Sequence, residues 1–112
     1  MSDQAYPEMI TRLPEVDVNL TGVRGWLSQG KGHQTVFFAI DPIGEIPLHS
    51  HGEQWGIVVE GEMDLTIGGQ TKRYRAGDSY HIPAGVEHGA KILTHLRAID
   101  VFADADRYKS KG

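Results

Sequence analysis

The segment GEIPLHSHGEQWGIVVEGE, residues 44–62, decides the fold together with GDSYHIPAGVEHG, residues 77–89. Both segments contain short runs rich in β-branched and aromatic residues, and glycine or proline closes each run. His49 and His51 are two residues apart in an expected strand, so their side chains leave the same face and converge on one point. An isolated His-x-His pair is more often a surface feature, so the pair alone does not establish a metal site.

The rest of the chain repeats the same pattern of short runs and turns. Runs of strand-forming residues recur roughly every 8–12 residues, which is typical of β-sandwiches and β-barrels. Gly68-Gly69 supplies the positive φ angles of a tight hairpin turn, and Asp41-Pro42-Ile43-Gly44 breaks the chain before the first motif. We therefore predict an all-β fold. Strands are expected around residues 16–20, 23–27, 35–40, 46–51, 55–59, 63–67, 70–74, 79–82, 87–92 and 96–102.

The length of 112 residues matches one domain with one core. We expect a loosely ordered N-terminal segment over residues 1–14, a single barrel domain over residues 15–103, and a polar C-terminal tail over residues 104–112 as short helix or coil. No repeat or linker interrupts the barrel segment.

The composition excludes several classes of function. A net charge of -4 offers no basic stripe for a phosphate backbone, so we expect no nucleic-acid partner. The absence of cysteine excludes disulfides and thiolate ligands, so a metal ion would need His, Gln or carboxylate groups. The N-terminus has no positively charged and apolar leader, and no segment is long enough to span a bilayer. A soluble cytoplasmic protein without a membrane partner is the expectation.

The two segments resemble the two signature motifs of the cupin superfamily, in the right order and over about half of the chain. In that family a glycine, a His-x-His pair, a glutamate and a second glycine form the first motif. The second motif consists of glycine, proline, glycine and histidine at fixed spacing. The matching residues are Gly44, His49, His51, Gln54 and Gly61 in the first motif, and Gly77, Pro83, Gly85 and His88 in the second.

This resemblance implies a cupin-type double-stranded β-helix, or jelly-roll barrel, that binds one divalent metal ion. The implied ligands are His49, His51, His88 and the residue at the glutamate position. Gln54 occupies that position if the six-residue distance to the next glycine is kept, and Glu53 does if the register differs. Imidazole ligands suit zinc, nickel, iron, copper or manganese, and the sequence does not choose among them.

Among small single-domain cupins, the chain looks most like the type that converts unsaturated monouronates into linear keto sugar acids. The metal set of that type is His, His, Gln, His, so a glutamine at position 54 is expected there. The resemblance also implies catalytic roles for Asp100 and for Arg107, whose spacing is shifted by one residue, and substrate contacts for Phe102. Tyr80 is a further candidate at the border of the cavity. The hypothesis is a metal-dependent isomerase that opens a sugar ring, with a small anionic sugar-like ligand.

The alternation along residues 96–102 independently places Asp100 on a mostly apolar face. A buried carboxylate needs a partner or a function, but the pattern alone leaves a solvated Asp100 equally open.

Two other functions remain open. One is another metal-dependent cupin enzyme such as a dioxygenase, and the other is a non-enzymatic barrel that binds a small anion. We also expect a homodimer, because small barrels leave sheet edges and apolar outer faces, here including Ile99 and Val101, that a second copy commonly covers. The remaining histidines and the tryptophans are interpreted as incidental or structural: His33, His81, His95, Trp26 and Trp55.

Overall fold

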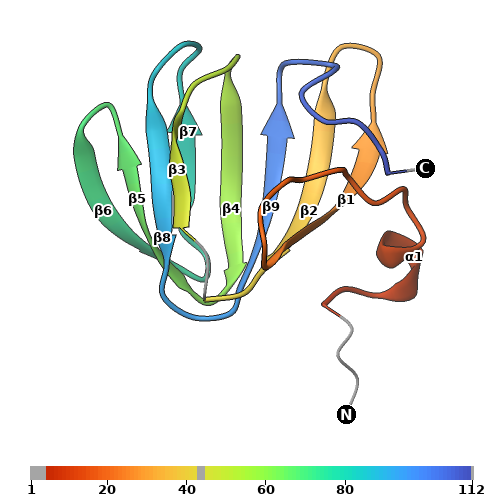
Figure 1. Cartoon of the computed structure of the whole chain (residues 1–112), viewed down its shortest axis with the longest axis horizontal. Helices are drawn as coiled ribbons and strands as arrows, with labels where there is room; N and C mark the ends of the chain where they lie inside the picture. The colour runs from red at the N-terminus through yellow and green to blue at the C-terminus, as the bar shows by residue number, and fades with distance from the viewer. Residues whose placement is uncertain (1–4, 43–44, 112) are drawn as a thin grey trace.

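The strands of the chain form two antiparallel sheets in a computed structural model that describes residues 5–42 and 45–111 (Figure 1). The strand order is β1-β2-β9-β4-β7 in one sheet and β3-β8-β5-β6 in the other. The elements within the described residues are α1 (Glu8–Thr11), β1 (Val23–Gln29), β2 (Gln34–Ile40), β3 (Glu45–His49), β4 (Gln54–Glu60), β5 (Glu62–Ile67), β6 (Gln70–Arg75), β7 (Ser79–Ile82), β8 (His88–Ile92) and β9 (Leu96–Phe102). The all-β prediction is confirmed.

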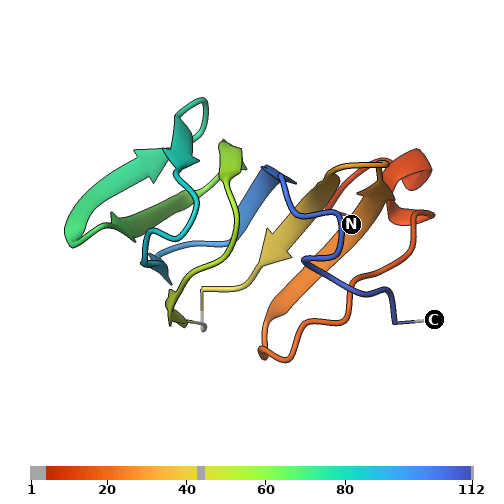
Figure 2. The ribbon, with the colours of Figure 1, turned by 90° about the horizontal axis from the view of Figure 1, so that it is seen from above.

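The two sheets are not equally close along their width. Seen from above, they approach each other at β7 and β6 and diverge toward β1 and β3 (Figure 2). β9, the last strand, pairs with β2 on one side and β4 on the other, so it lies in the middle of its sheet. Residues on the inner faces of β9, β4 and β8 therefore lie between the sheets, where the core and a cavity are found.

The core is built by strict alternation of inward and outward side chains. β2 and β9 both alternate between buried and half-buried residues over their whole length. Asp100 is 3% exposed, so the prediction that it shares the buried face of β9 is confirmed. The other inward residues of β9 are Leu96, Ala98 and Phe102, and the outward ones are Arg97, Ile99 and Val101.

Glycines form the turns that the sequence predicted around the β5–β6 hairpin. Gly68 and Gly69 both have positive φ, at 56° and 84°, and they connect the two strands without steric cost. Gly61, between β4 and β5, has φ 92°, and a side chain there would collide with the backbone oxygen of His95. The predicted turn at residues 41–44 lies partly outside the described residues, because positions 43 and 44, including Gly44 of the first motif, are not described.

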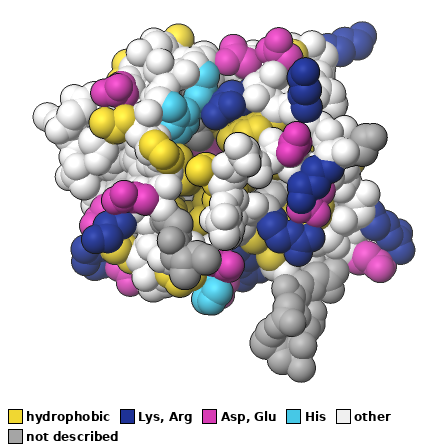
Figure 3. All heavy atoms as spheres, viewed as in Figure 1, with side chains coloured by type: hydrophobic (Ala, Val, Ile, Leu, Met, Phe, Trp, Pro, Cys, Tyr) yellow, Lys and Arg dark blue, Asp and Glu magenta, His cyan; other side chains and the backbone are white. Residues whose placement is uncertain are grey.

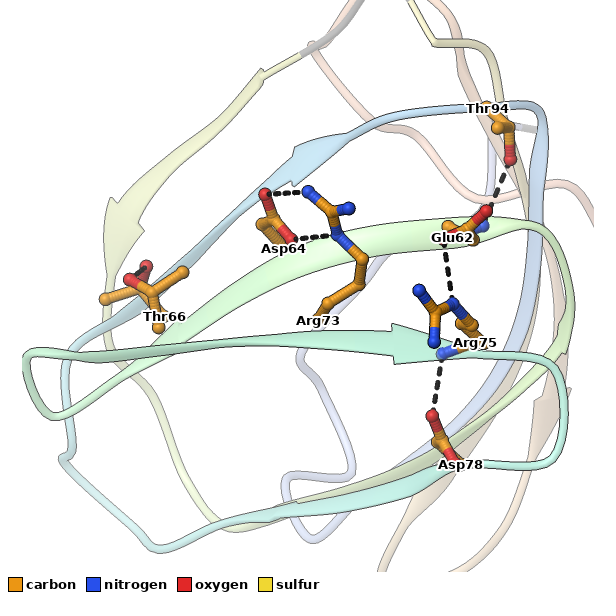
Figure 4. A network of polar contacts seen from close by, with 8 residues as sticks. Glu62, Asp64, Thr66, Arg73, Arg75, Asp78 and Thr94 are labelled. Atoms are coloured by element: carbon orange, nitrogen blue, oxygen red, sulfur yellow. Dashed lines mark hydrogen bonds and ion pairs between the residues drawn. The ribbon is translucent and has the colours of Figure 1, made fainter.

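The outer face of β5 and β6 is polar. Arg73 forms an ion pair with Asp64 at 2.9 Å, and Arg75 forms one with Glu62 at 3.0 Å (Figure 4). The Arg75 backbone N–H also donates to the Asp78 carboxylate at 2.8 Å, which closes the turn after β6. Such exposed pairs contribute little stability each, but they keep this face hydrated.

The prediction of a strand around residues 16–20 is wrong. Only isolated bridges form there, between Glu15 and Trp26 and between Val16 and Ser110. The segment crosses the edge of β1 and then turns toward the interior, so Val18 and Leu20 contact the cavity instead of pairing with a neighbouring strand. Strand alternation alone does not distinguish this arrangement from a paired strand.

The N-terminal segment packs on the barrel over its described part. Residues 5–14, which we expected to be loosely ordered, include α1 and a buried Tyr6 whose hydroxyl donates to the backbone oxygen of Phe38 at 2.6 Å. The Tyr6 ring lies edge-on to Trp26, which is buried as the structural interpretation requires. Trp55 is different, with 43% of its surface exposed on the outer face of β4.

The C-terminal segment after β9 is coil that folds back onto the sheets. The backbone N–H and carbonyl of Tyr108 bond with the side chain of Gln34, each at 2.9 Å. Asp17 N–H donates to Lys109 O at 2.7 Å and thereby joins the two terminal segments. Within the described part of the chain, no helix has the length and apolarity that crossing a membrane requires.

The Glu15 carboxylate, in the N-terminal segment, forms ion pairs with Arg24 of β1 and with Lys111 of the C-terminal segment. Hydrogen bonds and charge from Arg24, and then from Lys111, lower the pKa of Glu15 to about 2 from its usual 4.5. A lowered folded-state pKa stabilises the fold above pH 4.5, and this contribution is lost as the pH falls toward 2. Glu15→Gln should therefore lower the free energy of unfolding at pH 7 by up to about 1 kcal/mol, because the pair is partly exposed.

Urea unfolding at several pH values measures this difference. The gap between wild type and Glu15→Gln should narrow steadily below pH 4.5. Glu8→Gln, which breaks the exposed pair between Glu8 of α1 and Arg12 just after it, is the matched control and should change stability less. Equal stabilities of wild type and Glu15→Gln at pH 7 would show that the ion pairs of Glu15 do not stabilise the fold.

Candidate metal centre

Three histidines meet where β3 and β8 pair. His49 ends β3 and lies opposite His88, the first residue of β8, in the antiparallel register. β3 ends at His49, so the strand predicted over residues 46–51 is too long at this end and His51 lies in the following loop. The centre of the His51 ring still lies 4.8 Å from that of His88. The ligand atoms of all three histidines lie within 4.8 Å of one another, as the motif spacing predicted.

Backbone carbonyls orient the three imidazole rings. The Nδ1 atoms of His49, His51 and His88 lie 2.8, 2.9 and 3.0 Å from the carbonyl oxygens of Pro47, Gly52 and Val86. A carbonyl oxygen only accepts, so each Nδ1 carries the proton and each Nε2 presents a lone pair. The Nε2 atoms of His51 and His88 are buried without a hydrogen-bond partner. Metal-binding histidines normally donate the N–H of their second ring nitrogen to a carbonyl or carboxylate oxygen in this way.

Burial favours the neutral, metal-binding form of the His51 and His88 imidazoles. It lowers the pKa of His51 and of His88, and the positive charge of Arg107 lowers both further. The neutral rings of His51 and His88 can approach each other this closely, whereas two protonated rings would repel. The cluster is therefore prepared to bind a cation.

Gln54 supplies an amide oxygen as a fourth donor at the cavity that the three histidines line. Its amide nitrogen donates to Asp100 Oδ1 at 2.8 Å, and its amide oxygen is buried without a partner. A buried carbonyl-type oxygen without a partner is unfavourable unless something positive approaches it. Three imidazole nitrogens and one amide oxygen are a donor set that fits a divalent first-row transition metal ion.

Glu53, the alternative fourth ligand, points away from the histidines. Its carboxylate is exposed and lies 2.6 Å from Nε2 of His81 on the outer face of β4 and β7. His95 is also remote from the cluster, since it pairs with Asp41 at 3.3 Å on the surface. Of the two residues that the sequence left open, Gln54 is the one beside the three histidines.

Asp100 lies beside the fourth ligand position and is fully buried. Its Oδ1 accepts from the Tyr80 hydroxyl at 2.7 Å as well as from Gln54. Burial raises the pKa of the Asp100 carboxyl to about 6, although the hydrogen bonds from Tyr80 and Gln54 act in the opposite direction. A carboxyl group in this range can accept and return a proton near neutral pH.

A cavity of about 240 Å³ adjoins the centre. The space-filling view shows hydrophobic side chains in a hollow, with histidine side chains at its rim (Figure 3). The polar residues that line the cavity are His49, His51, Gln54, Tyr80, His88, Asp100, Arg107 and Tyr108. All the predicted site residues therefore border one space.

Phe102 and Arg107 close the polar end of this cavity. The Phe102 ring packs edge-on against His51 at 5.5 Å, and the Arg107 guanidinium lies 4.4 Å from the centre of the Tyr108 ring. Nε of Arg107 is buried without a hydrogen-bond partner, so it has a donor to offer to an anionic ligand. Sequence reasoning missed Tyr108, because the C-terminal segment carries no periodic pattern that would have placed it at the cavity.

The fold and the histidine centre define a class, and the comparisons agree with it. The model of the Cupin domain family matches residues 36–102, and the chain belongs to this family. A curated relative, the H2HPP isomerase of Bacillus subtilis, is 30% identical over 97% of this chain. The chain spans 46% of that protein, about half its length.

Solved structures show the same architecture. An RmlC-like cupin from Shewanella frigidimarina has a TM-score of 0.78 and 28% identity, over 96% of this chain and 95% of that one. KdgF from Halomonas sp. has a TM-score of 0.71 and 24% identity, over 78% of this chain and 83% of that one. The jelly-roll fold expected from the motifs is thus confirmed.

Removal of one histidine tests the metal centre. His88→Ala should weaken binding of Co²⁺ or Zn²⁺ by more than about 100-fold, because the loss of outer-shell partners alone costs 10–100-fold. The purified chain should bind one ion, measured by equilibrium dialysis with elemental analysis. His81→Ala, which changes a histidine on the outer face of β7, is the matched control and should bind like wild type. Equal loss in both variants, or none in His88→Ala, would refute the site.

Proposed function

We propose that this cupin is a metal-dependent isomerase that opens the ring of unsaturated monouronates to give linear keto sugar acids. The observation that carries the proposal is one cavity bordered by a three-histidine and glutamine donor set, a buried carboxylate at Asp100 and an unpaired donor on Arg107. These are the groups that hold an anion and move a proton.

The relatives support isomerase chemistry at the level of the reaction class. The curated relative is named an isomerase, and its similarity extends over nearly all of this chain. At 24% sequence identity, the similarity to KdgF supports only the fold. The substrate class comes from the resemblance of the sequence to uronate-linearising cupins, including the glutamine at position 54.

Arg107, Phe102 and Asp100 can bind the substrate and transfer the proton needed for ring opening, and no second reactant is required. Arg107 pairs with the substrate carboxylate, and Phe102 packs against the face of the sugar ring. Asp100 accepts the proton of the anomeric hydroxyl, the carbonyl double bond forms, and the bond from that carbon to the ring oxygen breaks. The electron pair stays on the ring oxygen, which is then the oxygen of an enolate. Asp100 returns the proton to the far carbon of the double bond, which leaves a ketone, so the product is an isomer of the substrate.

A divalent ion held by His49, His51, His88 and Gln54 would supply positive charge for the substrate carboxylate and for the negative charge that develops on the ring oxygen. None of its four donors is charged, so the ion would keep its full double charge and attract anions. The remaining roles belong to side chains of the chain itself.

A second substrate class is favoured by the apolar part of the cavity. The half away from the histidines is lined by aliphatic and aromatic side chains with few hydrogen-bonding groups. These residues include Val18, Leu20, Val23, Phe38, Ile40, Ile46, Met63, Leu65, Ile92, Leu96 and Ala98. A carboxylic acid with an apolar body would leave fewer unpaired hydroxyls in this half than a sugar does.

A turnover assay tests the proposal. The metal-loaded chain should consume an unsaturated monouronate, seen as loss of the ultraviolet absorbance of the conjugated double bond. A chelator should abolish the reaction, and added metal should restore it. Asp100→Asn, assayed at metal concentrations that saturate the variant, should lower kcat by roughly 10²–10⁴-fold, the usual contribution of a general acid–base.

Other outcomes select other functions. No turnover of uronates by the metal-loaded wild type would contradict the proposal, and turnover of apolar oxo acids in the same assay would select the second substrate class. Oxygen consumption would select a dioxygenase, and binding without turnover would select a small-anion-binding barrel. Wild-type kcat in Asp100→Asn would remove Asp100 from the mechanism.

We further propose that the chain forms a homodimer through the outer face of its five-stranded sheet. Trp55 and Val59 are exposed there, 43% and 40%, and Val101 lies opposite Trp55 in the register. The middle of this face is apolar, since Ile57 and Ile99 lie opposite each other beside Trp55 and Val101, and the ion pairs Arg97–Glu60 and His81–Glu53 lie around it. Light scattering should give twice the mass of the chain for wild type and a smaller mass for Trp55→Glu. A monomeric wild type would contradict this proposal.

A further inference from the structure

We infer that Gly56, Tyr80 and Asp100 are positioning residues that hold the Gln54 amide with its oxygen directed at the metal position. The inference depends on the metal centre and not on the ring-opening reaction. Metal binding in the absence of any substrate therefore tests it separately from the proposed function.

The three residues lie side by side on three adjacent strands. In the registers of the five-stranded sheet, Gly56 of β4 is opposite Asp100 of β9 on one side and opposite Tyr80 of β7 on the other. The Tyr80 hydroxyl reaches across the glycine to Asp100 Oδ1 at 2.7 Å. Gln54 lies two residues before Gly56 on the same strand, so its side chain leaves the same face and meets the same carboxylate.

The absence of a side chain at position 56 makes this contact possible. A Cβ atom there would overlap Asp100 Oδ1 and the ring of Tyr80. Gly56 has no positive φ, so backbone freedom does not account for a glycine at this position. The space above it is occupied by the hydrogen bond between the tyrosine and the carboxylate.

The carboxylate decides which end of the Gln54 amide faces the metal position. Asp100 Oδ1 accepts two hydrogen bonds, one from Tyr80 and one from Gln54 Nε2. Rotation of the amide by half a turn would place its oxygen against Oδ1, so two acceptors would face each other and a donor would be lost. The observed orientation leaves Oε1 buried and unpaired, and Gln54 lines the same cavity as the three histidines.

The same pairing accounts for glutamine instead of glutamate at position 54. A glutamate would put a second carboxylate within hydrogen-bond distance of Asp100, and both could not be ionised without repulsion. The negative charge of the site therefore belongs to Asp100, one hydrogen bond beyond the ligand. Residues 54 and 100 are then interdependent, and their substitutions should not be additive.

Titration of the metal-free chain with Co²⁺ tests the inference, with the dissociation constant and the visible absorption of the bound ion as readouts. Asp100→Ala removes the acceptor and should weaken Co²⁺ binding by about 10–100-fold, as loss of an outer-shell partner does, and change the spectrum. Asp100→Asn keeps an oxygen acceptor and should bind within a few-fold of wild type with the same spectrum. Asp64→Ala, on the outer face of β5, is the matched control and should leave both readouts unchanged.

A double-substitution cycle adds a readout that does not depend on folding of the alanine variant. Gln54→Glu combined with Asp100→Asn should bind Co²⁺ about tenfold more tightly than Gln54→Glu alone, because the asparagine amide can donate to the new carboxylate. Wild-type affinity and spectrum in Asp100→Ala would overturn the inference. Equal losses in Asp100→Ala and Asp100→Asn, or additive effects in the cycle, would also overturn it.

Discussion

The antiparallel pairing of β3 with β8 places His49 opposite His88, and the chemistry of this protein depends on that contact. The two histidines come from motifs far apart in the sequence, and His51 joins them from the loop after β3. Three carbonyl oxygens hold the rings with Nδ1 protonated, which leaves the Nε2 lone pairs free. Two of those nitrogens and the Gln54 oxygen are buried without partners, so a cation would relieve several unfavourable desolvations at once.

The shape of the sandwich turns this cluster into a site with two unlike halves. The sheets diverge away from β6 and β7 (Figure 2). The cavity lies between them. Its polar half holds the histidines, Asp100 and the residues of the C-terminal segment, and its other half is apolar. The terminal segments complete the walls, with Val18 and Leu20 from one and Arg107 and Tyr108 from the other. The carboxylate of the proposed uronate would occupy the polar half of this space.

Much of this arrangement could be predicted from the sequence, because it is periodic or follows a motif. Alternation put Asp100 on the mostly apolar face of residues 96–102 but left its burial open, and motif spacing brought His49, His51 and His88 together. The segment at residues 16–20 has the same alternation as a strand, but the edge of β1 offers it only isolated bridges, so local pattern could not distinguish the two. The orientation of the Gln54 amide depends on Asp100, 46 positions away in the sequence, and no local signal carries that information. The choice between Glu53 and Gln54 likewise depends on the side of the five-stranded sheet on which each side chain lies.

Anomalous diffraction from crystals loaded with Co²⁺ would test the central claim most directly. The account predicts a single strong peak about 2.0–2.2 Å from Nε2 of His49, His51 and His88 and from Oε1 of Gln54. It also predicts that the Gln54 amide nitrogen remains bonded to Asp100 in the loaded protein. A peak elsewhere, or a cobalt ion bound by Glu53 or Asp100 without the three histidines, would contradict it.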